Sequence, residues 1–162
     1  MPLTLRPLAP TDRALLEGVL RSDETFRDEE VAVALELIDD ALSKPDSDYW
    51  FQVAVDDSAS APEGVVGYIC YGPTPMTDSS YDLYWIVAHG AARGKGVAGA
   101  LIGAMEGDLG GRNATGVRIE TSQMESYGAA RRVYDRHEYA EVGRIPDFYR
   151  EGDALVTFYK RL

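Results

Sequence analysis

Cysteine is nearly absent from this sequence, since Cys70 is the only one among its 162 residues. A single thiol excludes a disulfide within the chain and any Cys-x-x-Cys metal pair, so a reducing cytoplasm is the expected location. Cys70 lies within an apolar run at residues 68–71, which predicts a buried, inert thiol. The two histidines, His89 and His137, are far apart in sequence and form no metal-ligand pattern, so no metal site is expected.

Long hydrophobic runs and an excess of basic residues are also missing. No apolar run approaches the ~20 residues that span a bilayer, and the opening segment MPLTLRPLAP lacks the charged-then-apolar order of a secretory signal. The 16 Lys and Arg are outnumbered by 27 Asp and Glu, which gives a net charge of −11. Such a surface repels nucleic acids and anionic membranes, so neither is expected as a partner. It permits a local cationic pocket for a phosphate and favours cationic amines, although the acidity can equally serve solubility alone.

What is present indicates a single domain over residues 1–162. Hydrophobic residues make up 45% and charged residues 27%, as in ordinary globular proteins, and no linker long enough to split the chain interrupts it. Residue spacing and Gly/Pro breaks predict a mixed α/β order of elements. The predicted elements are a strand at 3–7, helices around 12–20 and 31–42, strands at 49–55, 64–71 and 81–88, a helix at 97–109, a strand at 116–121, a helix at 126–137, and strands at 140–145 and 154–160.

The chain is organised around residues 81–110, in which a strand, a glycine-rich turn and a helix follow one another. The helix is predicted from apolar residues at helical spacing, namely Val97, Leu101, Ile102, Met105 and Leu109. The first turn of a helix has unpaired N–H groups and the positive end of the helix dipole, and glycines let an anion approach closely. Arg93 and Lys95 add positive charge, so this unit predicts a phosphate or pyrophosphate site. The plainer alternative is that the glycines at 94, 96 and 99 only shape a tight connection.

Three glycine patterns compete for this turn. The P-loop pattern Gly-x-x-x-x-Gly-Lys-Ser/Thr fits poorly, because Gly90 to Lys95 is one residue short and Gly96 replaces the magnesium-binding hydroxyl. The dinucleotide pattern Gly-x-Gly-x-x-Gly matches residues 94–99, with Glu120 where a ribose-binding acid would lie. Its context is wrong, because the first glycine does not follow the strand directly and no further βαβ units come after it.

The third pattern, Gln/Arg-x-x-Gly-x-Gly/Ala, is satisfied by RGKGVA at residues 93–98. It is the pyrophosphate-binding signature of the GNAT superfamily of acyl-CoA-dependent N-acyltransferases, which this sequence resembles over about residues 64–162. Four further segments carry the resemblance: WIVAH at 85–89 to the family's fourth strand, RIETS at 118–122 to its fifth strand, AARRVY at 129–134 to the helix with its tyrosine, and RIPDFY at 144–149 to the approach to its last strand.

The resemblance implies a mixed α/β fold with a central, mostly antiparallel sheet of about seven strands flanked by about four helices. The sheet is expected to splay between its fourth and fifth strands, where acetyl-CoA would bind. The backbone of Ile86, Val87 and Ala88 would then face the pantetheine and the acyl carbonyl. The residues expected around the pyrophosphate are Arg93, Gly94, Lys95, Gly96, Val97, Ala98 and Gly99. Tyr127 stands where many family members have an asparagine that contacts the cofactor, so it is included as a further candidate.

The resemblance also suggests catalytic residues for direct acyl transfer to an amine. Tyr134 lies where the family commonly places a tyrosine near the sulfur, and a phenol with a pKa near 10 can protonate a departing thiolate. Its alternative role is a packed aromatic side chain. For the base, Asp82 lies on the strand at 81–88, on the same face as Tyr84 and Ile86 by strand alternation. Glu120 is the rival base, each carboxylate can instead be a solvated or ion-paired strand residue, and transfer without a dedicated base is a third option.

The acceptor is expected to be a primary amine of a small molecule or a peptide. Phe26, Tyr84 and Tyr149 are the candidate acceptor contacts, because the family walls its acceptor site with the first two helices and the last hairpin. Tyr149 follows a Pro-Asp-Phe turn, which argues against complete burial. The alternative function is a non-catalytic acyl-CoA-binding sensor, and a nucleotide-dependent oxidoreductase is a more distant one. The oligomeric state is left open, with a homodimer as one option that the resemblance implies.

Overall fold

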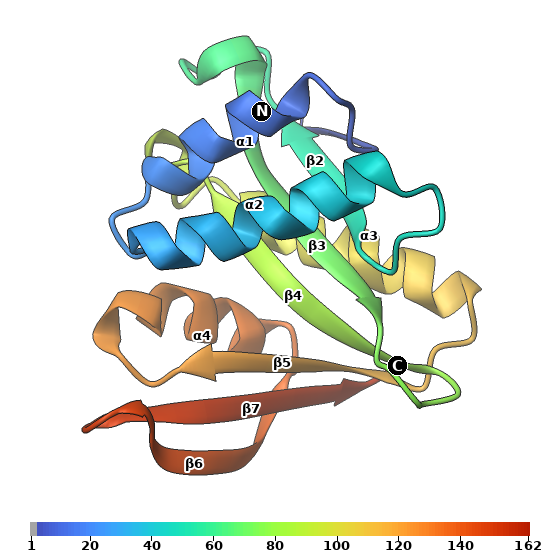
Figure 1. Ribbon diagram of the computed structural model, residues 1–162, viewed down its shortest axis with the longest axis vertical. Coiled ribbons are helices and arrows are strands. Elements are labelled where there is room, and N and C mark those ends of the chain that lie inside the picture. The colour runs from blue at the N-terminus through green and yellow to red at the C-terminus, as the bar shows by residue number, and fades with distance from the viewer. Residues whose placement is uncertain (1–2) are drawn as a thin grey trace.

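The computed structural model describes residues 3–162 as one seven-stranded sheet with helices on both faces (Figure 1). Met1 and Pro2 of the opening segment lie outside the described residues. The elements in chain order are β1 (Thr4–Arg6), α1 (Asp12–Arg21), α2 (Asp28–Ser43), β2 (Trp50–Val55), β3 (Val65–Pro73), β4 (Ser80–Ala88), α3 (Val97–Gly111), β5 (Gly116–Ser122), α4 (Gly128–Arg136), β6 (Ala140–Arg150) and β7 (Asp153–Arg161). This order is the predicted one, because the alternating and helical apolar spacings recur where these elements form.

The sheet has the strand order β1-β2-β3-β4-β5-β7-β6. All neighbouring strands are antiparallel except β4 and β5, which are parallel. The pairing of β4 with β5 covers only residues 80–83 and 116–119, and beyond Leu83 and Ile119 the two strands separate (Figure 1). The mixed, mostly antiparallel sheet and its splay between β4 and β5 are therefore confirmed.

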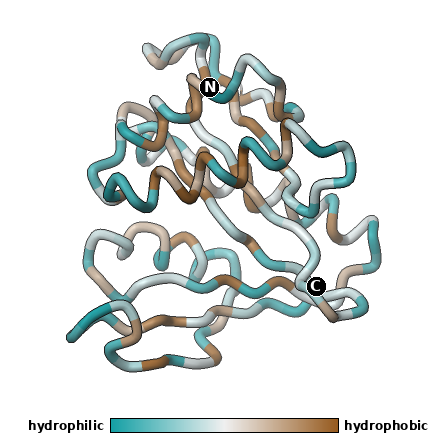
Figure 2. The backbone as a smooth tube through the Cα atoms, in the orientation of Figure 1, coloured by the Kyte–Doolittle hydropathy of each residue, from teal (hydrophilic) through white to brown (hydrophobic). Residues whose placement is uncertain are grey.

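The sheet is covered by α1 and α2 on one face and by α3 on the other (Figure 1). The five apolar residues predicted for the inner stripe of α3 are all buried, at 2% exposure or less. On the opposite face, the apolar residues of α2 recur between hydrophilic ones along the helix (Figure 2), and Val31 and Ile38 are buried. Each such side chain contributes about 1.5–3 kcal/mol through burial. The two apolar layers thus hold β4 in the centre of the molecule.

A β-bulge at Tyr84 changes the side-chain alternation of β4. Cys70 of β3 pairs with Trp85, whereas the next residue, Tyr71, pairs with Leu83, so Tyr84 has no partner of its own. As a result Tyr84 and Trp85 both pack on the α1–α2 face, whereas Ile86 packs on the α3 face. The prediction that Ile86 shares a face with Asp82 and Tyr84 is wrong, because an inserted residue reverses the alternation beyond it.

Several predicted boundaries are also corrected. Helix α3 continues through Gly110 and Gly111, and α4 begins at Gly128 after a short 3₁₀ turn at Glu125–Tyr127. Strand β3 includes Pro73, which pairs with Tyr81 at the end of the ladder. Strand β6 extends to Arg150 instead of ending at residue 145, with a break in register after Ile145. Asp147 lies in that break, and its carboxylate accepts a hydrogen bond at 2.7 Å from the N–H of Gly152 in the β6–β7 turn, which stabilises the hairpin.

Candidate functional site

The separation of β4 from β5 leaves one backbone edge of β4 without a strand partner. Apart from the bulge at Tyr84, the other edge of β4 is paired with β3 from Tyr81 to Ala88, for example Ile86 with Ile69 and Val87 with Tyr68. Backbone N–H and C=O groups require partners when they are covered. An extended ligand with amide groups can therefore complete the ladder along residues 84–88. This is the segment in which Ile86, Val87 and Ala88 were predicted to meet a cofactor.

The glycine turn after β4 has the conformation of an open anion site. Gly94 and Gly96 have φ values of +75° and +80°, in the left-handed region that favours glycine. A Cβ at either position would meet no heavy atom within 4 Å, so these glycines are required by the backbone and border open space. Gly96 caps α3, and the first helical hydrogen bond runs from the Ala100 N–H to the Gly96 carbonyl at 3.0 Å. The N–H groups of residues 97–99 therefore have no acceptor within the helix.

Arg93 and Lys95, the two cations predicted to assist this site, extend toward acids of different elements. Arg93 forms an ion pair with Asp23 in the segment between α1 and α2, at 2.5 Å. Lys95 is exposed and lies close enough to the β2–β3 hairpin to influence Asp56. Hydrogen bonds from Ser58 are the main cause of the lowered pKa of Asp56, and the charge of Lys95 adds to it. Arg93 is thus engaged by an acid of another element.

A pocket of about 510 Å³ lies between the α1–α2 segment and the turns that follow β4 and β5. It is lined by Ser22, Asp23, Glu24, Thr25, Gly90, Arg93 and Ser126. The segment between α1 and α2 borders it and contacts both sides of the splay. The Gly90 N–H donates to the Ser22 hydroxyl at 3.1 Å, and the Thr25 hydroxyl donates to the Ser126 carbonyl at 3.3 Å. The pocket therefore connects the glycine turn with the start of α4.

Tyr134 of α4 is buried, with 4% of its surface exposed. Its ring packs against Tyr139 and Phe158, with centroid distances of 6.3 and 5.7 Å. Burial raises the pKa of Tyr134 well above its usual value, so the phenol stays protonated at neutral pH. Within residues 3–162 no hydrogen bond joins this hydroxyl to another group, and burial alone accounts for its raised pKa.

Asp82 is buried in an ion pair that joins β4 to β5 just before the splay. Its carboxylate accepts hydrogen bonds from Arg118 at 2.7 and 3.2 Å and from the Thr74 hydroxyl at 2.8 Å. The hydrogen bond to Asp82 is also the main cause of the raised pKa of Arg118. These three bonds occupy most of the carboxylate's acceptor capacity. Arg118, which the sequence did not single out, is the residue that holds it.

Glu120 lies one residue beyond the last β5 pair with β4, at the edge of the splay. Its side chain is 47% exposed, and its nearest cation is Arg118 at 3.7 Å. Tyr149 of β6 is 44% exposed, which confirms that it is not wholly buried. The pKa of Tyr149 is raised by burial first and then by the charges of Glu120, Asp153 and Glu30. Glu120 of β5 and Glu30 of α2 thus lie close enough to Tyr149 of β6 for their charges to influence it.

Tyr127 lies at the start of α4 and is turned toward α2. Its hydroxyl donates to the Glu30 carboxylate, and its pKa is raised by burial and by this bond. Phe26 packs against the Tyr127 ring at 6.3 Å and against Trp85 at 5.5 Å. Tyr127 therefore joins the start of α4 to α2, and Phe26 of the α1–α2 segment joins Tyr127 to Trp85 of β4. Glu30 was missed because no local pattern distinguishes it from the other acids of α2.

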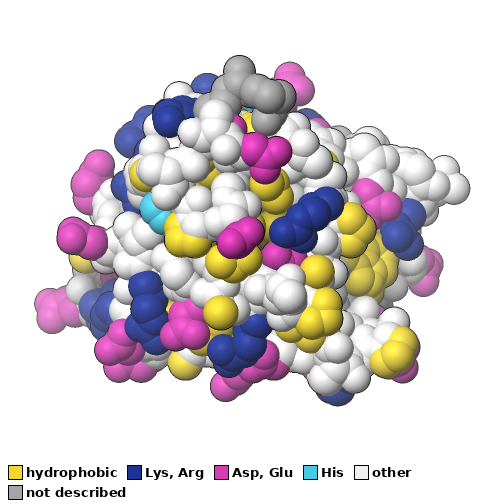
Figure 3. Space-filling model, turned by 90° about the horizontal axis from the view of Figure 1, so that it is seen from above, with side chains coloured by type: hydrophobic (Ala, Val, Ile, Leu, Met, Phe, Trp, Pro, Cys, Tyr) yellow, Lys and Arg dark blue, Asp and Glu magenta, His cyan; other side chains and the backbone are white. Residues whose placement is uncertain are grey.

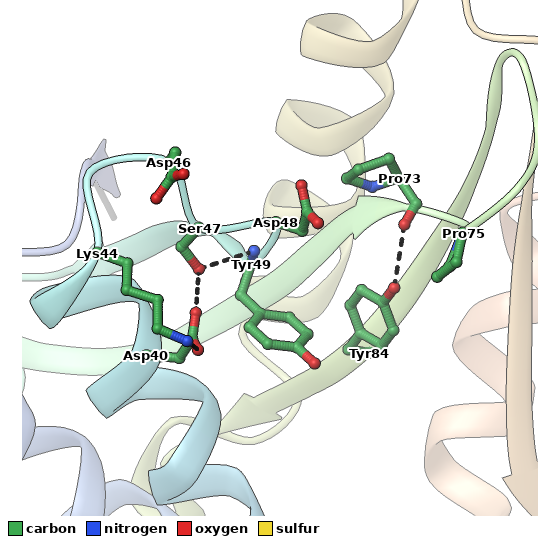
Figure 4. A pocket seen from close by; sticks show the side chains of 9 residues that line it. All are labelled: Asp40, Lys44, Asp46, Ser47, Asp48, Tyr49, Pro73, Pro75 and Tyr84. Carbon is green, nitrogen blue, oxygen red and sulfur yellow. Dashed lines mark hydrogen bonds and ion pairs between the residues drawn. The ribbon is translucent and has the colours of Figure 1, made fainter.

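Tyr84 lines a second pocket, of about 270 Å³, between the end of α2 and the β3–β4 connection (Figure 4). Its ring meets Tyr49 edge-on at 5.2 Å, and its hydroxyl donates to the Pro73 carbonyl at 3.2 Å. Burial is the first cause that raises the pKa of Tyr84 to about 12, and the charge of Asp82 is the second. In the same pocket Asp40 accepts hydrogen bonds from Lys44 and Ser47 (Figure 4).

The full sequence carries a net charge of −11. Seen from above, acidic and basic side chains are interspersed with hydrophobic ones (Figure 3). Among residues 3–162, none of the helices is both long and apolar enough to cross a membrane. Local contacts, more than the overall charge, therefore decide what the site can bind.

Comparison with known proteins agrees with this geometry. The family model described as "Acetyltransferase (GNAT) family" matches residues 14–139. A solved structure from Desulfovibrio desulfuricans, assigned to the GNAT family of acetyltransferases, is 31% identical, with a TM-score of 0.91 and 99% of each chain covered. Comparison with the curated proteins gave no significant match.

Two more distant structures share the fold. NAA60 of Arabidopsis thaliana, solved in complex with a bisubstrate analogue, is 19% identical, with a TM-score of 0.78 over 99% of this chain and 98% of that one. An aminoglycoside 6'-N-acetyltransferase complexed with coenzyme A is 16% identical, with a TM-score of 0.75 over 98% and 96% of the two chains.

Proposed function

The chain belongs to the GNAT family of acetyltransferases, and on that premise we propose that it transfers an acetyl group from acetyl-CoA to a primary amine of a small molecule or a peptide. The observation that carries this proposal is the splay between β4 and β5, which ends at the open glycine turn of α3. A free strand edge suits the amides of pantetheine, and a helix start with free N–H groups suits the pyrophosphate.

Acetyl-CoA, when bound, supplies an acetyl group activated as a thioester. The free N–H groups of β4 are suited to hold the carbonyl oxygen of that group as negative charge develops on it. The C–N bond then forms as the C–S bond breaks. Tyr134 gives its phenolic proton to the sulfur, because its hydroxyl is protonated and forms no hydrogen bond within the described residues. Cys70 takes no part, since burial raises the pKa of its thiol.

Glu120 is the better candidate for the base. It accepts the proton that the ammonium of the acceptor must lose, either directly or through a water. Asp82 is less suited, because its carboxylate already accepts hydrogen bonds from Arg118 and Thr74. Glu120 is exposed at the splay and faces the same region as Tyr149. We assign the acceptor to this side, between α2, β5 and the β6–β7 hairpin.

The first experiment compares thermal stabilisation by acetyl-CoA, CoA, NADH and ATP at matched concentrations. A ligand that binds only the folded state raises the melting temperature. The CoA species alone should do so, and Gly96→Asp should remove the effect by filling and charging the glycine turn. Gly103→Ala is the matched control, because a Cβ there also meets nothing within 4 Å but lies further along α3.

Catalysis is then tested by thiol release with a panel of amines. Release that depends on the amine supports transfer. Stabilisation by CoA without any release across a broad panel would support a binding protein instead. Stabilisation by NADH alone would overturn the assignment of the glycine turn to CoA.

The single buried thiol of Cys70 also supports a reducing location, so we propose the cytoplasm.

A further inference from the structure

His137 lies beside the first turn of α3. It follows the last residue of α4, where its backbone N–H bonds to the carbonyls of Val133 and Tyr134 at 3.1 Å each. A Cβ built on Gly99 would lie 3.2 Å from Nε2 of His137 and 3.8 Å from its Cε1. Apart from the adjacent residues and the backbone of α3 itself, no other described heavy atom would come within 4 Å of that Cβ. The tip of the imidazole ring is therefore the neighbour of Gly99.

The position of Gly99 places the imidazole near the anion-binding end of the helix. Gly99 is the third residue of α3, and its N–H is one of those without a helical acceptor. A Cα–Cβ bond in a helix leans toward the N-terminus. An atom that touches this Cβ position therefore flanks the turn whose N–H groups face outward. Among the described residues, no side-chain hydrogen bond of His137 is present, so Nε2 is available to a ligand.

The other basic groups near this turn are less well placed. Arg93 is held by Asp23 on the side of the α1–α2 segment. Lys95 is exposed and lies near Asp56 of the β2–β3 hairpin. His137 instead approaches from α4, where it is half-buried and its position is fixed by the helix end. A side chain held in this way loses little conformational freedom when it binds.

We propose that His137 binds the pyrophosphate of the cofactor, with Nε2–H donating a hydrogen bond to a phosphate oxygen over the first turn of α3. This inference rests on the proposed use of acetyl-CoA. A neutral imidazole can donate one such bond, and an imidazolium adds positive charge to it. Besides letting an anion approach the backbone, the absence of a side chain at Gly99 then leaves room for the ring that binds the anion.

The test measures dissociation constants for CoA, 3'-dephospho-CoA and pantetheine, which lacks every phosphate. The proteins are wild type, His137→Ala, His137→Gln and Arg136→Ala. Gln keeps an N–H donor near the position of Nε2, and Arg136 is an exposed neighbour that serves as the control for surface charge. His137→Ala should weaken CoA and dephospho-CoA equally, by about tenfold, as expected for one hydrogen bond to a charged group. His137→Gln should recover part of this loss, and Arg136→Ala should change little.

Three outcomes would overturn the inference. Unchanged binding of CoA by His137→Ala would show that the ring only packs on Gly99. An equal loss for pantetheine would show that the substitution disturbs the groove and not a phosphate contact. A loss for CoA without a loss for dephospho-CoA would assign His137 to the 3'-phosphate. Failure of wild type to bind CoA would instead count against the proposed function, so the two failures are distinguishable.

A mutant cycle with Gly99→Ala gives a second readout. In wild type the added methyl group must displace the imidazole, so CoA binding should weaken. In the His137→Ala background the ring is absent, and Gly99→Ala should have a much smaller effect. Equal effects of Gly99→Ala in both backgrounds would contradict the proposed role of the ring.

Discussion

Arg93 of the glycine turn and Asp23 of the α1–α2 segment form an ion pair with an N–O distance of 2.5 Å. The carboxylate of Asp23 also accepts a hydrogen bond from the Thr25 N–H at 2.9 Å. Hydrogen bonds from Thr25 and Arg93 together outweigh desolvation, which opposes them, and lower the pKa of Asp23. The pair thus links the proposed pyrophosphate site to the segment that borders the splay.

Asp23→Asn should strengthen CoA binding by about three- to tenfold. The substitution removes a competing negative charge near the turn, while the Asn oxygen can still accept from the Thr25 N–H. Isothermal titration at low and high salt checks this, because the gain should shrink as salt screens the charge. Asp28→Asn is the control, since Asp28 is highly exposed and is paired with Arg21, which is not part of the turn. Weaker binding by Asp23→Asn would mean that Asp23 holds Arg93 where the cofactor needs it.

Tyr134→Phe should lower kcat by about 10²-fold or more and leave the dissociation constant of acetyl-CoA unchanged. Within the described residues the hydroxyl forms no hydrogen bond, so its removal should affect folding little. Tyr139→Phe is the matched control: its hydroxyl donates to Glu106 at 3.0 Å, and its loss should affect stability more than kcat. An unchanged kcat for Tyr134→Phe would remove this residue from the mechanism.

Glu120→Gln and Asp82→Asn should have different effects. Glu120→Gln should lower kcat/KM by about 10²-fold with little change in stability, because Glu120 is exposed and its ion pair with Arg118 is long. Asp82→Asn leaves Arg118 without its partner and should cost about 1–2 kcal/mol of unfolding free energy, since Arg118 is itself partly solvated. The pH profile of kcat/KM and urea denaturation separate the two roles. If the fall of kcat/KM at low pH disappeared in Asp82→Asn but not in Glu120→Gln, Asp82 would be the base.

Asp12 should make stability depend on pH. Desolvation opposes its charged form, but hydrogen bonds from Arg6 and the Ala9 N–H, together with the charge of Arg6, lower its pKa below the usual 3.8. Because the folded pKa is the lower one, the stabilisation is present above the unfolded pKa and is lost as pH falls through the folded pKa.

Urea denaturation at several pH values checks this prediction. Asp12→Asn should cost about 1–3 kcal/mol near pH 7 and progressively less below about pH 4. Asp39→Asn removes an exposed pair with Arg13 and should cost under about 1 kcal/mol at every pH. A penalty for Asp12→Asn that did not shrink in acid would point to packing instead of charge.

The parts of the protein that could be predicted from sequence are those fixed by local spacing. The apolar stripe of α3 and the glycines that cap it follow from helical periodicity and backbone conformation, and both are present. The bulge at Tyr84 could not be predicted, because an extra residue in one strand is defined only by the register of its partner.

The ion pairs of the site were also beyond the sequence. Asp82 and Arg118 are opposite each other only because β4 and β5 pair in parallel at that register. Arg93 meets Asp23 only because the α1–α2 segment passes over the end of β4. The acids and bases were visible in the sequence, but which acid neutralises which base depends on the topology.

The short ladder between β4 and β5 has a mechanical consequence. Four backbone pairs are all that join the strands β1 to β4 to the strands β5 to β7 within the sheet. The sheet therefore has its shortest backbone ladder between the two central strands, and a ligand bound to both strands beyond Leu83 and Ile119 would add hydrogen bonds there. Such a ligand fills the gap between the two strands and also links them, so its binding should slow amide hydrogen exchange in β5 and β7 as well as in β4.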